Sequence, residues 1–173
     1  FSFGQMSKIA VITINLNNQV GLQKTIESVT NQTSHNFEYI IIDGNSNDGS
    51  KEVIQKYITK INYFVSEPDT GLYHAMNKGI KAAQADFLLF LNSGDTLCSD
   101  SIIEQVEKDL SSNYDIYYGN YNRVSQVSSE KVVFPSILSF SFFYSNTLCH
   151  QATFIRRKLF YDFFMYNEEY KIA

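Results

Sequence analysis

The stretch Lys8–Asp43 decides the fold and reads KIAVITINLNNQVGLQKTIESVTNQTSHNFEYIIID. Its first part, Lys8–Asn15, is a short run of mostly β-branched apolar residues, which predicts a buried strand. Apolar residues then recur at helical spacing over Gly21–Thr30, and Phe37–Asp43 is a second apolar run. A strand, a helix and a strand at this spacing predict a right-handed unit with two parallel strands.

The same alternation continues as far as residue 110. The further elements that we expect, three helices and two strands, are Lys51–Ile58, Leu72–Ala83, Ile102–Leu110, Ile61–Val65 and Phe87–Leu91. Ser50 or Asp48 is expected to cap the first of these helices, and Asp100 the last. The predicted fold class is therefore α/β, a single domain with a mainly parallel sheet and helices on both faces.

The pattern is weaker after Leu110. The elements expected there, three strands and a short helix, are Asp115–Tyr121, Arg123–Val127, Ala152–Ile155 and Lys158–Phe164. The aromatic-rich stretch Phe134–Tyr144, FPSILSFSFFY, is assigned to the core by default, because aromatic side chains bury readily. Stacking on a sugar and contact with a lipid-linked acceptor at a membrane are the alternatives for this stretch.

The composition fits a folded domain and excludes several classes. Of 173 residues, 44% are hydrophobic and 15% aromatic, so the chain can bury a core without disulfides. A net charge of −4 argues against a general nucleic-acid binder. Cys98 and Cys149 are too few for a disulfide framework and lack metal-site spacing, which fits a reducing compartment. No apolar run approaches the roughly 20 residues of a membrane helix, so a cytoplasmic location is expected.

Polar and acidic side chains follow the ends of the first four expected strands. They are Thr13, Asn15, Asp43, Glu67, Asp69, Asn92, Ser93 and Asp95. One such turn alone is explained by the preference of Asp, Asn and Gly for turns and caps, and Glu67 has this reading as an equal alternative. The carboxyl ends of parallel strands, however, meet at one edge, where open α/β sheets bind ligands. The convergence of several acidic turns on that edge favours a binding site.

Several familiar motifs are absent from these turns. The first turn reads NLNNQVG instead of GxGxxG, and neither GxxxxGK[ST] nor GxSxG occurs. The DGNSNDG stretch at Asp43–Gly49 resembles a calcium loop, but its glycine is at the seventh position and Ile54 stands at the twelfth. What remains is an acidic cleft suited to a hard divalent metal that bridges a phosphate ligand.

The order of these turns resembles the family 2 glycosyltransferases of the GT-A fold. The resemblance rests on TINLNN, then IIIDGNSNDGS, then SEPDTGLYHAMNKGIKAAQADFLLFLNSGDTL. It covers Lys8 to about Leu97 densely and Cys149–Phe160, CHQATFIRRKLF, more thinly. Bacterial enzymes that build surface polysaccharides look like this. The resemblance implies an inverting transfer of a sugar from a nucleotide-diphosphate sugar, most readily a UDP-sugar, to an acceptor hydroxyl.

The resemblance also implies which residues bind the donor. Thr13 and Asn15 would line the nucleotide pocket, and Asp43 would accept a hydrogen bond from the base. The other donor-binding residues that it implies are Asp69, Gly71, Lys78 and Ser93. Asp69 would face ribose or phosphate with Gly71 allowing close approach, whereas a solvated helix lysine is the alternative for Lys78.

The metal ligand that the resemblance implies is Asp95, holding Mg²⁺ or Mn²⁺. The family usually has Asp-any-Asp, and this chain has Ser93-Gly94-Asp95, so one carboxylate is missing. Weaker metal binding without the donor than with it is therefore expected. His150 is the implied second contact to the metal or the diphosphate, with a satisfied core histidine as its alternative.

A general base on the acceptor side is implied as well. Glu168 and Glu169 are the candidates within this chain, but in similar proteins the base follows a segment like EEYKIA by a few positions. We therefore expect the base beyond Ala173 and a domain that is truncated at its C-terminus. Residues 6–110 would be the nucleotide-sugar-binding core, 111–173 the incomplete start of the acceptor-side region, and 1–5 a cloning remnant.

Two other functions stay open at this point. One is a non-catalytic or degenerate module that binds a nucleotide sugar without transferring it. The other is a nucleotidyltransferase, which would need a glycine-rich basic loop where this chain has NLNNQVG. The expected partners are the donor and a saccharide or lipid-linked saccharide acceptor, with peripheral contact at the inner face of the plasma membrane and no nucleic acid. No pattern in the sequence identifies the sugar, the acceptor or the oligomeric state.

Overall fold

The structure is a computed structural model that describes residues 8–110, 113–125 and 127–170. Every structural statement below concerns these residues. The expected cloning remnant at residues 1–5 and the last three residues of EEYKIA lie outside them.

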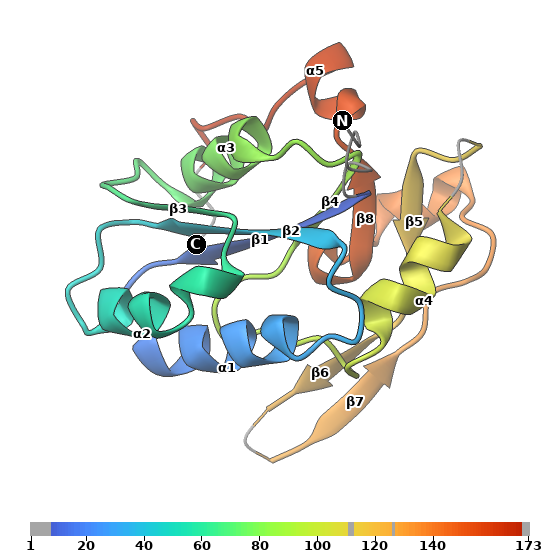
Figure 1. The fold of residues 1–173 in the computed structure, drawn as a ribbon. Helices are drawn as coiled ribbons and strands as arrows, with labels where there is room; N and C mark the ends of the chain where they lie inside the picture. The colour runs from blue at the N-terminus through green and yellow to red at the C-terminus, as the bar shows by residue number, and fades with distance from the viewer. Residues whose placement is uncertain (1–7, 111–112, 126, 171–173) are drawn as a thin grey trace, which may run out of the picture.

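A six-stranded sheet in the order β3-β2-β1-β4-β8-β5 forms the centre of the molecule (Figure 1). Its strands are β1 (Ile9–Asn15), β2 (Phe37–Asp43), β3 (Tyr63–Ser66), β4 (Phe87–Phe90), β5 (Ile116–Tyr118) and β8 (Thr153–Arg156). The strands β1 to β4 run parallel, and β8 is antiparallel to both of its neighbours, β4 and β5. A separate hairpin is formed by β6 (Tyr121–Val124) and β7 (Ser129–Val132).

Helices cover both faces of the sheet (Figure 1). One face carries α1 (Gln19–Thr30), α2 (Ser50–Lys56) and α4 (Ile102–Asp109), and the other carries α3 (Leu72–Ala82) and α5 (Lys158–Asp162). Three short 3₁₀ turns complete the elements: η1 (Ile58–Lys60), η2 (Phe140–Tyr144) and η3 (His150–Ala152). None of the helices in the described part combines the length and the hydropathy needed to cross a membrane.

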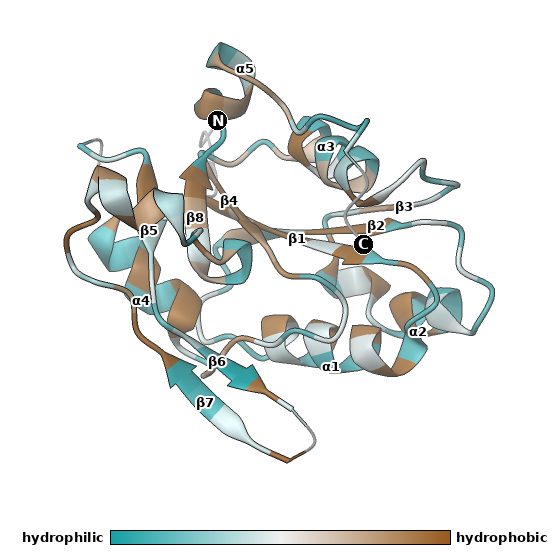
Figure 2. Cartoon of the chain, turned by 180° about the vertical axis from the view of Figure 1, so that it is seen from behind, coloured by the Kyte–Doolittle hydropathy of each residue, from teal (hydrophilic) through white to brown (hydrophobic). Residues whose placement is uncertain are grey.

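Side chains of β1 alternate between two hydrophobic cores, as the pleat of a strand requires. Ile9 and Val11 pack with residues of α1, α2 and α4, whereas Ala10 and Ile12 pack with residues of α3. Figure 2 shows the corresponding apolar colour along β1 and β4. The predicted α/β class, with a mainly parallel sheet covered on both faces, is confirmed.

The helix starts differ in part from the expectation. Gly49 is the N-cap residue of α2 and Ser50 is its first helical residue, so the prediction that Ser50 is the cap is wrong. Asp48, just before the helix, accepts hydrogen bonds from the backbone N and Oγ of Ser50, at 3.1 and 2.6 Å. The prediction that Asp100 caps α4 is wrong, because Ser101 is the N-cap residue and Gln32 Oε1 accepts from Ile103 N at 3.1 Å in the first turn.

The chain after Leu110 pairs differently from the expectation. The strand expected at 115–121 is split, since β5 joins the main sheet and Tyr121 begins the hairpin. The second expected strand, 123–127, corresponds to part of β6, and β7 was not expected at all. The hairpin is largely hydrophilic (Figure 2), so it lacks the apolar alternation that marks a half-buried strand.

The aromatic segment Phe134–Tyr144 does not form core. Phe140 and Tyr144 are each 81% exposed and Ile137 is 84% exposed. Phe134 and Phe142 contact each other with their ring centroids 6.0 Å apart. The default assignment of this segment to the core is therefore wrong, because its rings pack mainly on one another near the surface.

Gly79 allows α3 to approach β1 closely. A Cβ at this position would lie 2.5 Å from Cγ2 of Ile12, well inside a normal carbon contact. We expect Gly79→Ala to lower the free energy of unfolding by about 1–2 kcal/mol, since overpacking outweighs the better helix propensity of alanine. Urea unfolding measures this loss. Lys81→Ala, at an exposed position of the same helix, should change stability by less than about 0.5 kcal/mol, and equal effects would contradict the close packing.

Candidate functional site

The carboxyl ends of β1 to β4 lie at one edge of the sheet, and the antiparallel β8 begins at that same edge. The turn η3 before β8 therefore lies beside the loop that follows β4, although the two are far apart in sequence. Two polar clusters form along this edge, one around Asp43 and one around Asp95. The loop after β1 contacts both, since Asn17 N donates to Ser46 Oγ at 2.8 Å and Asn18 Nδ2 donates to the Ser93 carbonyl at 2.9 Å.

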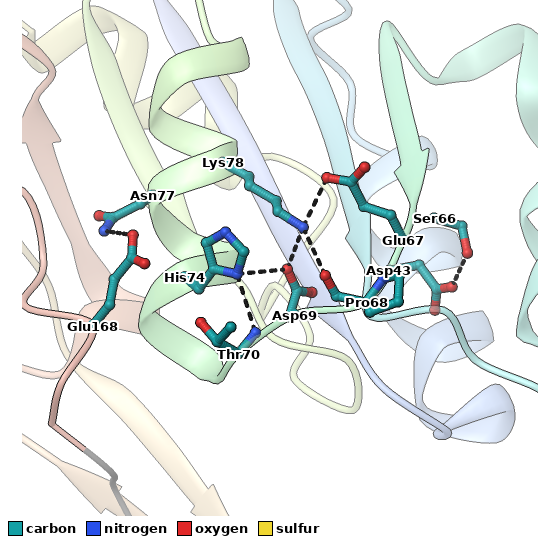
Figure 3. A network of polar contacts seen from close by, with 10 residues as sticks. All are labelled: Asp43, Ser66, Glu67, Pro68, Asp69, Thr70, His74, Asn77, Lys78 and Glu168. Atoms are coloured by element: carbon teal, nitrogen blue, oxygen red, sulfur yellow. Dashed lines mark hydrogen bonds and ion pairs between the residues drawn. The ribbon is translucent and has the colours of Figure 1, made fainter.

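Asp43 is the centre of the first cluster and is completely buried. Its carboxylate accepts from Asn15 Nδ2 at 2.8 Å, Ser46 N at 3.0 Å, Ser46 Oγ at 2.5 Å and Ser66 Oγ at 2.5 Å. Figure 3 shows the contact with Ser66. Burial raises the pKa of Asp43, but these hydrogen bonds outweigh it and hold the pKa below its ordinary value. The carboxylate is thus charged at neutral pH.

Thr13 and Asn15 are both buried, but they differ in what they can offer a ligand. Thr13 Oγ1 lies 3.2 Å from the hydroxyl of Tyr39 inside the core, so the expectation that Thr13 lines the pocket is wrong. Its place follows from its position in β1, since Thr13 lies two residues before the end of the strand, where helices cover both faces of the sheet. Asn15 Oδ1 has no hydrogen-bond partner among the described residues, and a buried unpaired amide oxygen calls for a ligand.

Lys78 of α3 joins the acidic loop after β3 (Figure 3). Its Nζ lies 2.6 Å from Asp69 Oδ1 and 2.8 Å from Glu67 Oε1, and it donates to the Pro68 carbonyl at 3.3 Å. Burial lowers the pKa of Lys78, but the two carboxylates outweigh it and raise the pKa above its ordinary value. With its side chain 16% exposed, Lys78 is not the freely solvated lysine of the alternative reading.

The loop between β3 and α3 is held close to the end of β2. Glu67 N donates to the Asp43 carbonyl at 3.0 Å, and a Cβ at Gly44 would lie 3.3 Å from Asp69 Oδ2. His74 Nδ1 accepts from Thr70 N at 3.1 Å and fixes the following turn. A Cβ at Gly71 would meet no atom within 4 Å, so this loop borders open space. The arrangement brings Asp69 and Asp43 together, as the sequence predicted.

The second cluster is built on the turn after β4. Asp95 N donates to the Asn92 carbonyl at 2.9 Å, and Gly94 has a φ of 105°, a left-handed conformation that favours glycine. Thr25 of α1 holds this turn in place, because its Oγ1 accepts from Gly94 N at 2.9 Å and donates to the Asp95 carbonyl at 2.7 Å. The backbone that carries the Asp95 carboxylate is therefore fixed.

The turn η3 brings His150 and Gln151 to this cluster. His150 Nε2 lies 3.2 Å from Asn92 Nδ2, and Gln151 Nε2 donates to Asp95 Oδ2 at 3.0 Å. Burial lowers the pKa of His150, although the charge of Asp95 opposes it, so the ring is neutral at pH 7. The structure thus brings Asp95 and His150 together. Asn92, which was already expected at this edge, contacts the His150 ring. The structure adds Gln151, whose only signal in the sequence was that it adjoins His150.

The chemistry of the second cluster fits a hard divalent cation that is bound together with a ligand. No group of three or more His, Cys, Asp or Glu side chains that could hold a metal occurs in the described ranges. Asn92 Oδ1 is nevertheless buried without a partner there, on the side chain whose Nδ2 lies 3.2 Å from His150 Nε2. Oxygen and imidazole donors of this kind suit Mg²⁺ or Mn²⁺ once phosphate oxygens and water complete the shell.

The two late carboxylates lie outside these clusters. Glu168 Oε1 accepts from Asn77 Nδ2 at 2.8 Å on the side of α3 (Figure 3). Asn77 also bonds the backbone N and O of Tyr166, at 3.0 and 2.9 Å, so it fastens this segment to α3. Glu169 is exposed. Within the described residues, neither glutamate has a hydrogen bond or ion pair to Asp95 or His150.

A pocket of about 570 Å³ adjoins the second cluster between α4, β5 and β6. Its wall includes Asp95 and Gln151 on the side of the second cluster, together with Tyr118, Asn120 and Gln105. Rings and amide groups of this kind offer both apolar contact and hydrogen bonds to a ligand.

Several known proteins are similar in sequence to this chain. The family model described as Glycosyl transferase family 2 matches residues 10–167. An uncharacterized glycosyltransferase of Mycobacterium tuberculosis (strain H37Rv) is 39% identical over 104 residues, which are 60% of this chain and 40% of that protein. A PGL/p-HBAD biosynthesis glycosyltransferase of Mycobacterium bovis is 26% identical, over 94% of this chain and 64% of that protein. The chain therefore spans only part of the length of these relatives.

Solved structures resemble the whole described fold. TarS residues 1–349 from S. aureus, in complex with UDP, superposes with a TM-score of 0.79 at 21% identity, covering 96% of this chain and 52% of that one. The mannosyltransferase PcManGT from Pyrobaculum calidifontis, in complex with GDP-Man and Mn²⁺, gives 0.70 at 12% identity, covering 94% of this chain and 48% of that one. These likenesses establish the GT-A fold that the sequence predicted.

Proposed function

Because this chain belongs to glycosyl transferase family 2, we propose that it transfers a sugar from a nucleoside-diphosphate sugar to an acceptor hydroxyl. One observation carries the proposal: the clusters around Asp43 and Asp95 lie at the ligand-binding edge of the sheet and are joined by Asn17 and Asn18. One cluster suits a base and the other a diphosphate with its cation. A nucleoside diphosphate has these two parts in one molecule.

The first cluster is proposed to hold the nucleoside. The unpaired Asn15 Oδ1 is an acceptor that suits the ring N–H of a uracil-type base, and Asp43 would accept from the base once Ser46 or Ser66 turns its hydroxyl away. Asp69, oriented by Lys78, would accept from the ribose beside the open space at Gly71. A UDP-sugar is the donor that we favour, and the UDP in the TarS complex supports this choice.

The second cluster is proposed to hold the diphosphate and Mg²⁺ or Mn²⁺. Asp95, His150 and Asn92 Oδ1 would bind the cation, and Ser93 would face the phosphates. Such a cation, when bound, neutralises the charge that develops on the leaving diphosphate. The Mn²⁺ in the PcManGT complex supports this assignment. Because the turn at Gly94 is fixed, the Asp95 carboxylate would not have to reorient as charge develops on the leaving diphosphate. Such preorganisation is the main source of electrostatic catalysis.

We further propose an inverting transfer to a saccharide or lipid-linked saccharide acceptor in surface-glycan synthesis, at the cytoplasmic face of the plasma membrane. The relatives named for PGL/p-HBAD biosynthesis support a glycan pathway of this kind. Inversion needs a base to take the acceptor proton. We assign that role to neither late carboxylate, because Glu168 is bonded to Asn77 and the exposed Glu169 side chain has no hydrogen bond or ion pair among the described residues.

Calorimetric titration with UDP, GDP and dTDP, each with and without Mn²⁺, tests the proposal. We expect UDP to bind, and to bind about tenfold more tightly or better with Mn²⁺. ATP provides the control for non-specific binding of a metal-phosphate complex. If Mn²⁺ strengthened the binding of none of the three diphosphates, the proposed function would be wrong. Metal-dependent binding in a longer chain that never transfers sugar would instead favour the degenerate binding module, which the missing family carboxylate also allows.

A further inference from the structure

We propose that Gln151 is a positioning residue that sets the orientation of the Asp95 carboxylate toward the divalent cation, an inference that rests on the proposed function. Gln151 Nε2 donates to Asp95 Oδ2 at 3.0 Å across 56 residues of sequence. Among the described residues, no other side chain bonds this carboxylate. The contact exists because β8 is antiparallel, which places the start of the strand beside the loop that follows β4.

The side chain of Gln151 is itself held in one orientation. Its Oε1 accepts from Cys149 Sγ at 3.0 Å. A carboxylate can only accept and the thiol has a proton to give, so the amide oxygen faces Cys149 and the amide nitrogen faces Asp95. The backbone is fixed as well, because the Cys149 carbonyl accepts from Ala152 N at 3.0 Å and from Thr153 Oγ1 at 2.7 Å.

This geometry leaves the carboxylate ready for a cation. Gln151 holds Oδ2, and Oδ1 has no hydrogen bond in the described ranges, so one oxygen is fixed while the other is available. An amide orients the carboxylate without neutralising it, whereas a lysine or arginine would compete with the cation. Orientation matters more here than in relatives with two acidic residues, since Ser93-Gly94-Asp95 offers a single carboxylate. Groups that orient metal ligands in this way contribute about 10- to 100-fold in metal affinity.

Gln151→Met tests the inference, because methionine has a similar length and volume but cannot donate. UDP binding is measured with and without Mn²⁺ by calorimetry, and thermal unfolding is followed in parallel. We expect the strengthening by Mn²⁺ to fall about 10-fold or more, while metal-free UDP affinity and the melting temperature stay unchanged. Gln151→Asn should show the same loss as Gln151→Met, because the asparagine side chain is one methylene too short to reach Asp95. Gln23→Met, at an exposed position of α1 outside the pocket and bonded to Glu27 instead, is the matched control.

The outcomes separate this inference from the proposed function. If wild type shows the Mn²⁺ effect and Gln151→Met and Gln151→Asn keep it in full, the positioning role is wrong and the proposed function stands. Equal weakening of UDP binding with and without Mn²⁺ would also overturn the inference, since Gln151 would then contact the nucleotide itself. If wild type shows no Mn²⁺ effect, the proposed function is wrong and the role of Gln151 falls with it.

Discussion

Asp95→Asn is expected to remove the strengthening of UDP binding by Mn²⁺ and to lower sugar transfer by about 100-fold or more. The substitution keeps the shape of the side chain and an oxygen that can accept from Gln151 Nε2, so the turn around Gly94 should be preserved. It removes the only charge that this turn offers to a cation. Metal-free UDP affinity should change by less than about twofold, since the nucleoside is held by the other cluster.

Calorimetry with UDP and Mn²⁺ checks this prediction, and release of UDP from a UDP-sugar reports the transfer. Asp100→Asn is the matched control, because it removes an exposed carboxylate five positions later that makes no side-chain hydrogen bond or ion pair within the described part of the chain. Retention of the full Mn²⁺ effect in Asp95→Asn would show that the cation binds elsewhere.

Asp43→Ala is expected to lower the free energy of unfolding by about 3 kcal/mol and to abolish measurable UDP binding. The substitution leaves buried donors on Asn15, Ser46 and Ser66 without their shared acceptor. Each unpaired buried donor costs about 1–3 kcal/mol, and relaxation of the small serines recovers part of the total. Urea unfolding gives the loss. Asp109→Ala, at an exposed site on α4, should stay within about 0.5 kcal/mol.

The same carboxylate makes stability depend on pH. The pKa of Asp43 in the folded protein is below its ordinary value, so the unfolded chain binds a proton more readily than the folded one. Its contribution is therefore complete above the ordinary pKa and is lost as pH falls through the folded-state value, below about pH 4. Asp43→Asn should flatten the fall in stability in that range. An unchanged slope would contradict the charged state that the hydrogen bonds imply.

The sequence predicted the first four strands well because each is a local apolar run followed by its own helix. It predicted for the same reason that the polar turns share one edge, since parallel strands bring their carboxyl ends together whatever their order. Thr13 was misplaced although a signal existed, because it stands two residues before the end of the apolar run and only the last residue of that run reaches the edge of the sheet. Asp43 and Asp95 were predicted to lie at this edge because Asp43 ends one buried strand and Asp95 lies in the turn after another.

The parts of the fold and of the candidate site that the sequence did not predict depend on contacts between segments that are far apart in the sequence. The expected strand at 152–155 gave no sign that it would insert antiparallel between β4 and β5, and this insertion brings Gln151 to Asp95. A short apolar run does not specify its partner or its direction. The contacts of Asn77 with Tyr166 and Glu168 could not be predicted either, because a single buried amide on a helix produces no recognisable sequence pattern.

Paramagnetic NMR tests the central claim, that one nucleoside diphosphate and its cation occupy the two clusters, most directly. The protein is titrated with UDP in the presence of Mg²⁺, and traces of Mn²⁺ are then added. We predict that UDP shifts the amide signals of Asn15 and Ser46, and that Mn²⁺ first broadens those of Asp95, His150 and Gln151. Broadening confined to the exposed carboxylates of α4, with the signals of both clusters unchanged, would contradict the account.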